Sequence, residues 1–248
     1  MPLKCKTHMN FRKIILLLIV FMGACSYPHK MYYARSGNPK TLLDTCNSKE
    51  CLTQLIKINP DNVEAHWWLG TKYQAEHNYT EAITEFNKAI ELDSSYNLGF
   101  PYRDRANCKN NLSDDLGAVM DMDVAIRNNP EERYFYYDRG TYLYNLNKYD
   151  MALNDFNKAL EIWSKFDEAR VWKAKLLVQL KNYKEAIIEY ETLNISNDFI
   201  TNPNNAYDIY YRGLAYFNVN SLDKACTDWK ASAPNCEEAK IKLEKYCK

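Results

Sequence analysis

The sequence predicts an all-α fold, an α-α superhelix of about five helix-turn-helix repeats closed by a C-terminal helix. A small residue returns at spacings of 36, 34, 34 and 39 residues, at Gly70, Ala106, Gly140, Ala174 and Gly213. An alanine follows 12 residues after each, and four residues later comes a large side chain: Phe86, Met122, Phe156, Tyr190 or Trp229. Apolar residues then recur at the i, i+4, i+7 spacing of a helix face. A repeat of about 34 residues indicates a solenoid of stacked helices.

The first residues are expected to be a targeting signal. Lys4, Lys6, Arg12 and Lys13 precede the apolar run Ile14–Met22, which ends in Gly23-Ala24-Cys25. This order is typical of a secretory signal peptide. The run from Ile14 to Cys25 has 12 residues, whereas a membrane-spanning helix needs about 20.

The Gly-Ala-Cys ending resembles the lipobox of bacterial lipoproteins, in which the cysteine is lipidated and becomes the first residue. The resemblance implies a signal peptide over residues 1–24, lipidation of Cys25 and a linker over residues 25–47. An ordinary signal peptide cut nearby is the alternative. Both Met1 and Met9 remain possible starts.

The remaining elements follow in chain order. Residues 48–62 are expected to hold a helix of a partial repeat, since Pro60 ends it as Pro130 ends the second helix of a full repeat. Five full repeats are expected over residues 63–96, 99–132, 133–166, 167–200 and 206–234. A polar breaker such as Asn147-Lys148 separates the helices of each repeat. Asn235 begins a capping helix over residues 235–248, with Glu238 as its capping-box partner.

The pattern resembles the tetratricopeptide repeat (TPR) over nearly all of residues 48–248. The first full repeat carries Trp68-Leu69-Gly70, Tyr73, Ala82, Phe86 and Ala89, and the third carries Tyr137-Asp138-Arg139-Gly140, Ala152, Phe156 and Ala159. The small residues let paired helices approach closely, and the large side chain fills the space above them. The resemblance implies a non-catalytic protein whose first helices line a concave groove for a partner peptide or helix.

The same resemblance assigns positions on the first helices to this groove. The expected partner-binding residues are Trp67, Phe100, Arg103, Asn107, Tyr134, Tyr137, Tyr144, Tyr207, Tyr210 and Phe217. Tyr and Trp suit recognition surfaces because they offer a large contact area at a low entropic cost. Two alternatives stay open: the rings could pack between neighbouring repeats, or a glycan-binding or enzyme-accessory protein could use them as a stacking platform.

Arginine and aspartate occur together in three repeats. Arg105, Arg139 and Arg212 precede the small residue, and 16 residues after each arginine comes Asp121, Asp155 or Asp228. The other two repeats have Leu69 and Lys173 in the arginine position, with Glu85 and Glu189 in the aspartate position. The sequence therefore predicts three structural ion pairs between paired helices, because a planar guanidinium matches a carboxylate with two parallel hydrogen bonds.

Six cysteines follow Cys25, and an even number permits disulfides in an oxidising compartment. We predict a disulfide between Cys226 and Cys247, because the capping helix reverses direction at Ala233-Pro234-Asn235 and returns towards the start of its predecessor. Cys46–Cys51 is a second candidate, and Cys108 and Cys236 would then be free thiols.

Charge and motifs narrow the function. Residues 25–248 carry 28 basic and 32 acidic groups, a net charge of 28 − 32 = −4, so nothing points to nucleic acid. Neither a catalytic motif nor a metal-ligand spacing is evident, and we expect no enzyme activity, no cofactor and no metal. The expected partners are a protein or peptide and, through the lipid, a membrane.

The expected location is the cell envelope, with the anchor in the outer membrane and the protein facing the periplasm. The Tyr-, Asn- and Lys-rich usage is similar to that of Bacteroidetes envelope proteins.

Overall fold

The structure is a computed structural model of the 248-residue chain. It describes residue 46, residues 48–193 and residues 205–247. The predicted signal peptide, Cys25, most of the linker and the end of the fourth predicted repeat lie outside the described residues. The chain divides into two compact units, Met1–Pro60 and Asp61–Lys248.

The described part of the first unit is one helix with a disulfide at its start. Helix α2 spans Lys49–Ile58, and the side chain of Ser48 caps it by accepting a hydrogen bond from the backbone N–H of Cys51 at 3.2 Å. A disulfide joins Cys46 to Cys51, and their Cα atoms are 5.5 Å apart.

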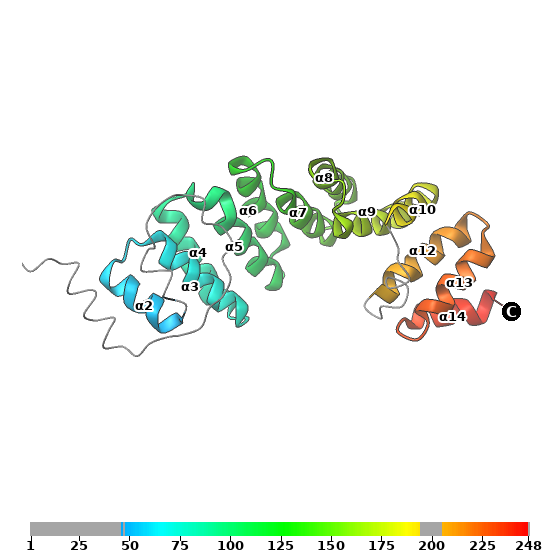
Figure 1. The fold of residues 1–248 in the computed structure, drawn as a ribbon, viewed down its shortest axis with the longest axis horizontal. Helices are drawn as coiled ribbons and strands as arrows, with labels where there is room; N and C mark the ends of the chain where they lie inside the picture. The colour runs from blue at the N-terminus through cyan, green and yellow to red at the C-terminus, as the bar shows by residue number, and fades with distance from the viewer. Residues whose placement is uncertain (1–45, 47, 194–204, 248) are drawn as a thin grey trace, which may run out of the picture. The chain divides into compact units, whose positions relative to one another are not determined.

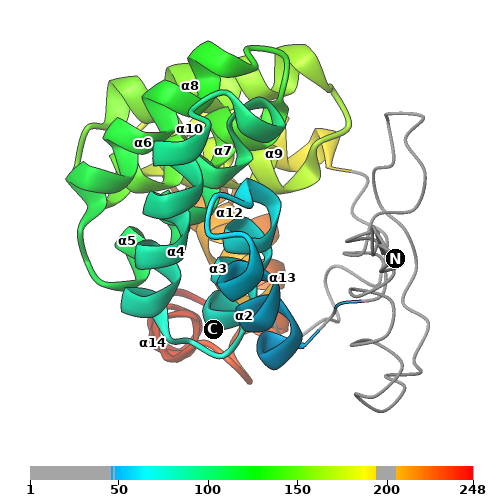
Figure 2. The ribbon, with the colours of Figure 1, turned by 90° about the vertical axis from the view of Figure 1, so that its left-hand side faces the viewer.

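The described residues of the second unit form five pairs of α-helices, one further α-helix and a short 3₁₀ helix (Figures 1 and 2). The first helices of the pairs are α3 (Val63–Ala75), α5 (Phe100–Asn111), α7 (Arg133–Asn145), α9 (Asp167–Gln179) and α12 (Ala206–Asn218). The second helices are α4 (Tyr79–Leu92), α6 (Asp115–Asn128), α8 (Tyr149–Ile162), α10 (Tyr183–Thr192) and α13 (Leu222–Ser232). The last helix is α14 (Glu237–Tyr246).

Each first helix packs against the second helix of its own pair, and each second helix packs against the helix that follows. The described residues form only α-helices, one 3₁₀ helix and connections, with no strand among them. The predicted all-α superhelix of stacked helix pairs is therefore confirmed.

The turn inside every pair uses the same backbone conformation. One non-glycine residue with φ between 58° and 66° follows each first helix: His77, Ser113, Asn147, Lys181 or Asn220. The next residue returns its N–H to a carbonyl five residues earlier, as Asn78 does to Tyr73 at 2.9 Å. This is the Schellman arrangement that ends a helix. None of the five positions holds a β-branched residue, which would be strained at positive φ.

The small residues hold the paired helices close together, as the sequence predicts. A Cβ atom added at Gly140 would lie 2.7 Å from a ring carbon of Phe156, and one added at Gly70 would lie 2.6 Å from the ring of Phe86. Both rings are fully buried. Glycine is therefore required where these rings cross the first helix, because no side chain fits in the space.

One connection contains a short helix that the sequence did not predict, and one prediction about the last helix is wrong. The extra residues before the second repeat include a 3₁₀ helix, Tyr96–Gly99, in which Asn97 and Leu98 have φ of 50° and 52°. The last helix begins at Glu237, and Cys236 occupies its N-cap, where its thiol donates to Oε2 of Glu238 at 3.4 Å and caps no backbone N–H of the helix. Asn235 still belongs to the preceding turn, because its N–H bonds the carbonyl of Ser232 at 3.0 Å. The predicted capping box between Asn235 and Glu238 is therefore wrong.

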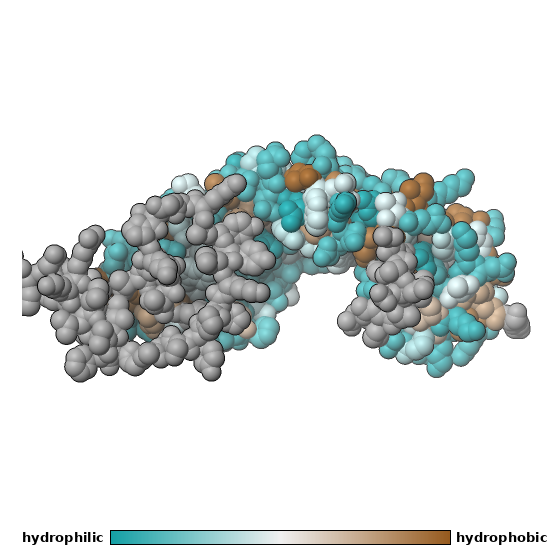
Figure 3. Space-filling model, in the orientation of Figure 1, coloured by the Kyte–Doolittle hydropathy of each residue, from teal (hydrophilic) through white to brown (hydrophobic). Residues whose placement is uncertain are grey.

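The face drawn in Figure 3 is mostly hydrophilic where it is coloured, with small, separate hydrophobic patches. Among the described residues, no helix has the length and apolar character needed to cross a membrane.

Candidate functional site

Side chains on successive first helices bond one another directly. The indole Nε1 of Trp67 on α3 donates a hydrogen bond to Oδ2 of Asp104 on α5 at 2.7 Å. Arg103, also on α5, donates from Nε to Oδ2 of Asp138 on α7 at 2.7 Å. These contacts set the position of α3 against α5 and of α5 against α7.

Three further contacts continue the series. The hydroxyl of Tyr142 donates to Oδ1 of Asn107 at 2.5 Å, which joins α7 to α5. Nε2 of Gln179 donates to the hydroxyl of Tyr144 at 3.3 Å, which joins α9 to α7. Lys175 on α9 forms an ion pair with Asp208 on α12. We call these five contacts the first-helix ladder: Trp67–Asp104, Arg103–Asp138, Tyr142–Asn107, Gln179–Tyr144 and Lys175–Asp208.

Four of the predicted partner-binding residues belong to the first-helix ladder, namely Trp67, Arg103, Asn107 and Tyr144. For these four, packing between repeats is the arrangement observed. Each side chain is half-buried, so part of it remains in contact with solvent. They can therefore order the surface of the first helices and still form part of it.

Four other predicted residues contact aromatic rings and are half-buried. The ring centroids are 5.2 Å apart for Phe100 and Phe135, 5.0 Å for Tyr134 and Phe166, 5.1 Å for Tyr137 and Phe166, and 5.6 Å for Tyr210 and Tyr211. Tyr207 is different, because 51% of its surface is exposed. It offers the most accessible ring of the predicted set.

Phe217 does not fit the expectation of a partner-facing ring. Its centroid lies 4.7 Å from that of Tyr246 on α14 and 5.5 Å from that of Trp229 on α13. Helix α14 packs on α13 in the way that α5 packs on α4 and α7 packs on α6. It therefore occupies the place that the first helix of a further pair would take. Phe217 therefore helps to seat the C-terminal helix.

Burial changes the acidity of the carboxylates in the ladder. Desolvation raises the pKa of Asp104 to about 6, against the opposing effects of the Trp67 hydrogen bond and the Arg103 charge. Desolvation also raises the pKa of Asp138, and its salt bridge with Arg103 opposes that rise. The charge of Asp104 therefore changes close to neutral pH.

All three predicted structural ion pairs are present. Arg105, Arg139 and Arg212 each donate from Nε at 2.8 Å and from Nη2 at 2.6 Å to the two carboxylate oxygens of Asp121, Asp155 and Asp228, respectively. All three carboxylates are buried. These pairs lock the first helix of a repeat to the second.

The remaining nitrogen of two of these arginines reaches the preceding repeat, which sequence reasoning missed. Nη1 of Arg105 donates to Asn87, and Nη1 of Arg139 donates to Asp123, each at 2.6 Å. Asn87 and Asp123 directly follow the large residues Phe86 and Met122. A polar acceptor recurring in that position is the signal that could have revealed the contact.

The two repeats without an Arg–Asp pair use a different partner for their glutamate. Nδ1 of His66 lies 2.6 Å from Oε2 of Glu85, and Nη1 of Arg170 lies 2.7 Å from Oε2 of Glu189. His66 and Arg170 each lie four residues before the small residue, one helical turn earlier than the arginines of the other repeats. Lys173 also contacts Glu189 at 2.6 Å. The longer side chain of glutamate reaches a basic group one turn away.

The predicted disulfide in the C-terminal region is present, and two other cysteines are free. A disulfide joins Cys226 to Cys247, with Cα atoms 5.7 Å apart, and ties the end of α14 to the first half of α13. Cys108 and Cys236 are buried and free. Desolvation raises the pKa of Cys108 to about 12, so its thiol stays protonated and unreactive at neutral pH.

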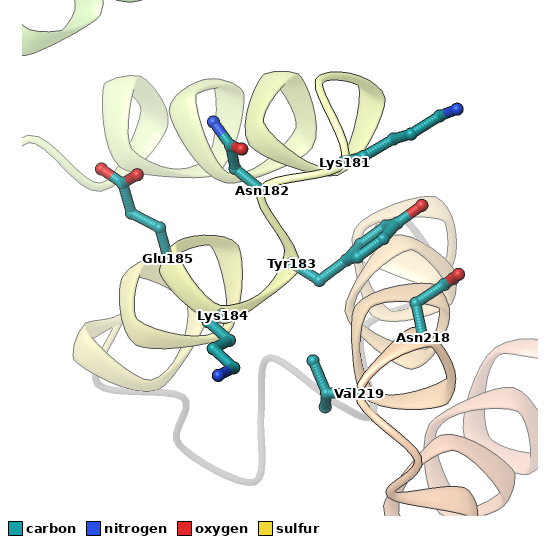
Figure 4. A pocket seen from close by; sticks show the side chains of 7 residues that line it. All are labelled: Lys181, Asn182, Tyr183, Lys184, Glu185, Asn218 and Val219. Carbon is teal, nitrogen blue, oxygen red and sulfur yellow. The ribbon is translucent and has the colours of Figure 1, made fainter.

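A shallow depression of about 500 Å³ lies beside the turn of the fourth pair (Figure 4). Its lining comes from the α9–α10 turn, the start of α10 and the end of α12, and includes Tyr183, Lys184 and Asn218. It contains none of the predicted site residues. No group of three or more potential metal-ligating side chains occurs within the described residues.

Residues 63–96, which hold α3 and α4, match the protein-family model described as the tetratricopeptide repeat. This repeat lies in an array of helix pairs that has the fold of a TPR solenoid. A second family model, described as anaphase-promoting complex, cyclosome, subunit 3, matches residues 118–193 of the TPR array.

Solved TPR structures share the fold at low sequence identity. YrrB, described as a TPR protein with an unusual peptide-binding site, is 21% identical, with 80% of this chain and 98% of YrrB covered and a TM-score of 0.65. A TPR protein from Parabacteroides merdae is 24% identical, with 80% and 79% covered and a TM-score of 0.62. Anaphase-promoting complex subunit 3 of Schizosaccharomyces pombe is 26% identical over 149 residues. That alignment covers 58% of this chain and 21% of the yeast protein.

Proposed function

We propose that this protein is a non-catalytic adaptor of the bacterial cell envelope that binds a peptide or short helix of a partner protein on its first helices. The observation that carries the proposal is the first-helix ladder. Its contacts fix neighbouring first helices before any partner arrives, while half-buried aromatic side chains remain at their surface.

A surface ordered in advance favours binding. Association costs conformational entropy whenever side chains or helices become ordered on binding. Because the ladder contacts already order the first helices in the folded protein, less entropy is lost when a partner binds. The accessible ring of Tyr207 and the half-buried rings of Tyr134, Tyr144 and Tyr210 add apolar contact area with polar tips. This combination suits a peptide or a short helix.

The fold supports the same class of function. TPR proteins in general mediate interactions between proteins, and the related fold of YrrB carries a peptide-binding site. We extend peptide binding to this chain on that basis and on the geometry of its first helices.

The envelope location is proposed from the N-terminal sequence. Four basic residues, a short apolar run and Gly23-Ala24-Cys25 are typical of an exported lipoprotein. The disulfides Cys46–Cys51 and Cys226–Cys247 support an oxidising compartment such as the periplasm.

An array of short synthetic peptides tests the binding function. The full chain is expected to bind a subset of peptides, and Tyr207→Ala combined with Tyr210→Ala is expected to weaken that binding at least tenfold. Met120→Ala on the second helix α6, where the side chain is 62% exposed, is the matched control and should have no effect.

If Met120→Ala abolishes binding and the double tyrosine variant does not, the site lies on the second helices and the proposal is contradicted. Binding to a glycan array, with no binding to peptides, would favour the glycan-binding alternative.

A further inference from the structure

Arg133, the first residue of α7, lies against three aromatic rings. Its guanidinium carbon lies 4.5 Å from the ring centroid of Trp163, 4.6 Å from that of Tyr134 and 5.7 Å from that of Phe166. Its Nε is buried and has no hydrogen-bond partner among the described residues. The charge therefore lies against π-systems, which attract a cation but accept no strong hydrogen bond from it.

Every other arginine on a first helix has a carboxylate partner. These are Arg103, Arg105, Arg139, Arg170 and Arg212. Among the described residues, no carboxylate oxygen lies within 4.0 Å of a guanidinium nitrogen of Arg133, which is the distance limit of an ion pair. Its donors are therefore unmatched in the part of the chain that the structure describes.

The carboxylates of Glu132 and Asp138, at the start of α7 and within it, already bind other groups. Oε1 of Glu132 accepts the backbone N–H of Tyr134 at 3.2 Å and so caps the helix. Asp138, further along α7, is bound by Arg103. Neither group compensates Arg133.

The rings also limit how the guanidinium moves. A guanidinium already in contact with aromatic rings loses little further freedom when it binds an anion, which favours binding. Arg133 as a whole is half-buried, and Nε is the one of its nitrogens that is buried without a partner. Its terminal nitrogens therefore remain available to a ligand from outside the described residues.

We propose that Arg133, held by Trp163 and Tyr134, binds the carboxylate of an Asp or Glu side chain in the partner segment. The inference rests on the proposed peptide-binding function and names the chemistry of the partner. The guanidinium donates two hydrogen bonds to the carboxylate oxygens, and the rings exclude water from one side of the ion pair.

The test uses an array of short peptides with both termini blocked, together with copies that carry either a phosphorylated serine or a free C-terminal carboxylate. Each peptide with an internal Asp or Glu has a matched copy with Asn or Gln in the same place. The full chain is expected to bind the acidic copies at least tenfold more tightly, and added salt is expected to reduce the difference. Arg133→Gln should abolish the preference while binding to the amide copies stays unchanged.

Three variants separate recognition from a structural role. Arg127→Gln removes an exposed arginine at the end of α6 and should keep the full acidic preference. Arg133→Lys keeps the charge without the planar group and should keep only part of the preference. Trp163→Leu should reduce the preference by releasing the guanidinium. Thermal melting of each variant shows whether the fold is intact.

The outcomes are distinguishable. An acidic preference that survives in Arg133→Gln overturns the inference, as does stronger binding to a phosphorylated residue or to a free C-terminal carboxylate. Peptide binding without any acidic preference overturns the inference and leaves the proposed function standing. A full chain that binds no peptide contradicts both.

Discussion

Two parallel hydrogen bonds join Arg139 on α7 to Asp155 on α8, from Nε at 2.8 Å and from Nη2 at 2.6 Å. The third nitrogen, Nη1, bonds Asp123 on α6 of the preceding repeat at 2.6 Å. One side chain thus connects three consecutive helices. Because each repeat of a solenoid contacts only its neighbours, such a residue couples the stability of adjacent repeats.

Replacing Arg139 tests this coupling. Arg139→Met is expected to lower the free energy of unfolding by about 3 kcal/mol, because it leaves the buried carboxylate of Asp155 without a counter-charge. Arg139→Met combined with Asp155→Leu is expected to recover more than half of the loss, since no buried charge then remains unpaired. Urea unfolding at neutral pH measures both. Equal losses in the single and double variants would mean that packing alone holds these helices.

Asp104 predicts a pH dependence of stability. The pKa of this group is 3.8 in the unfolded reference and about 6 in the fold. The neutral form is favoured in the folded state, so the contribution of Asp104 is fully present below pH 3.8 and is lost as the pH rises through about 6.

Asp104→Asn keeps an acceptor for Trp67 and removes the charge. It is therefore expected to raise the free energy of unfolding at pH 7.5 by about 1–3 kcal/mol and to have almost no effect at pH 4. Thermal melting of both proteins across this range checks the prediction. A variant that is less stable at pH 7.5 would show that Arg103 and Trp67 stabilise the carboxylate more than burial destabilises it.

The disulfide Cys226–Cys247 is expected to hold α14 on the array. The double variant Cys226→Ser and Cys247→Ser should make local opening of α14 easier by about 2–4 kcal/mol, because the cross-link restricts the opened chain. Hydrogen exchange of the α14 amides measures this directly. The matched variant Cys46→Ser with Cys51→Ser should leave α14 unchanged. Peptide mapping under non-reducing conditions that finds Cys247 free would contradict the bond.

Membrane attachment is expected to depend on Cys25. Cys25→Ser should move the protein from the membrane fraction to the wash, because the acyl chains provide the affinity for the bilayer. Cys236→Ser, which changes a buried free thiol, is the control and should stay with the membrane. Retention of the Cys25 variant in washed membranes would mean that another contact holds it there.

Much of the fold could be predicted because the relevant interactions are local or repeat regularly. The close approach at Gly140 and Phe156 follows from a fixed spacing of 16 residues, and so do the three Arg–Asp pairs. The surroundings of Tyr137 could not be predicted from its position in the repeat. Its register on α7 suggested a partner-facing ring, yet the ring packs near Phe166, which directly precedes the following first helix, α9.

The sequence by itself determined the helices, their pairing and the charged pairs within repeats, because each depends on residues at constant short separations. The tertiary structure decided the first-helix ladder, the contact from Arg139 to Asp123 and the lack of a carboxylate partner for Arg133 among the described residues. Those contacts join residues on different repeats or depend on which carboxylates another residue has already bound. They are set by the rotation of one repeat on the next, and a small change in that rotation would give each side chain a different neighbour.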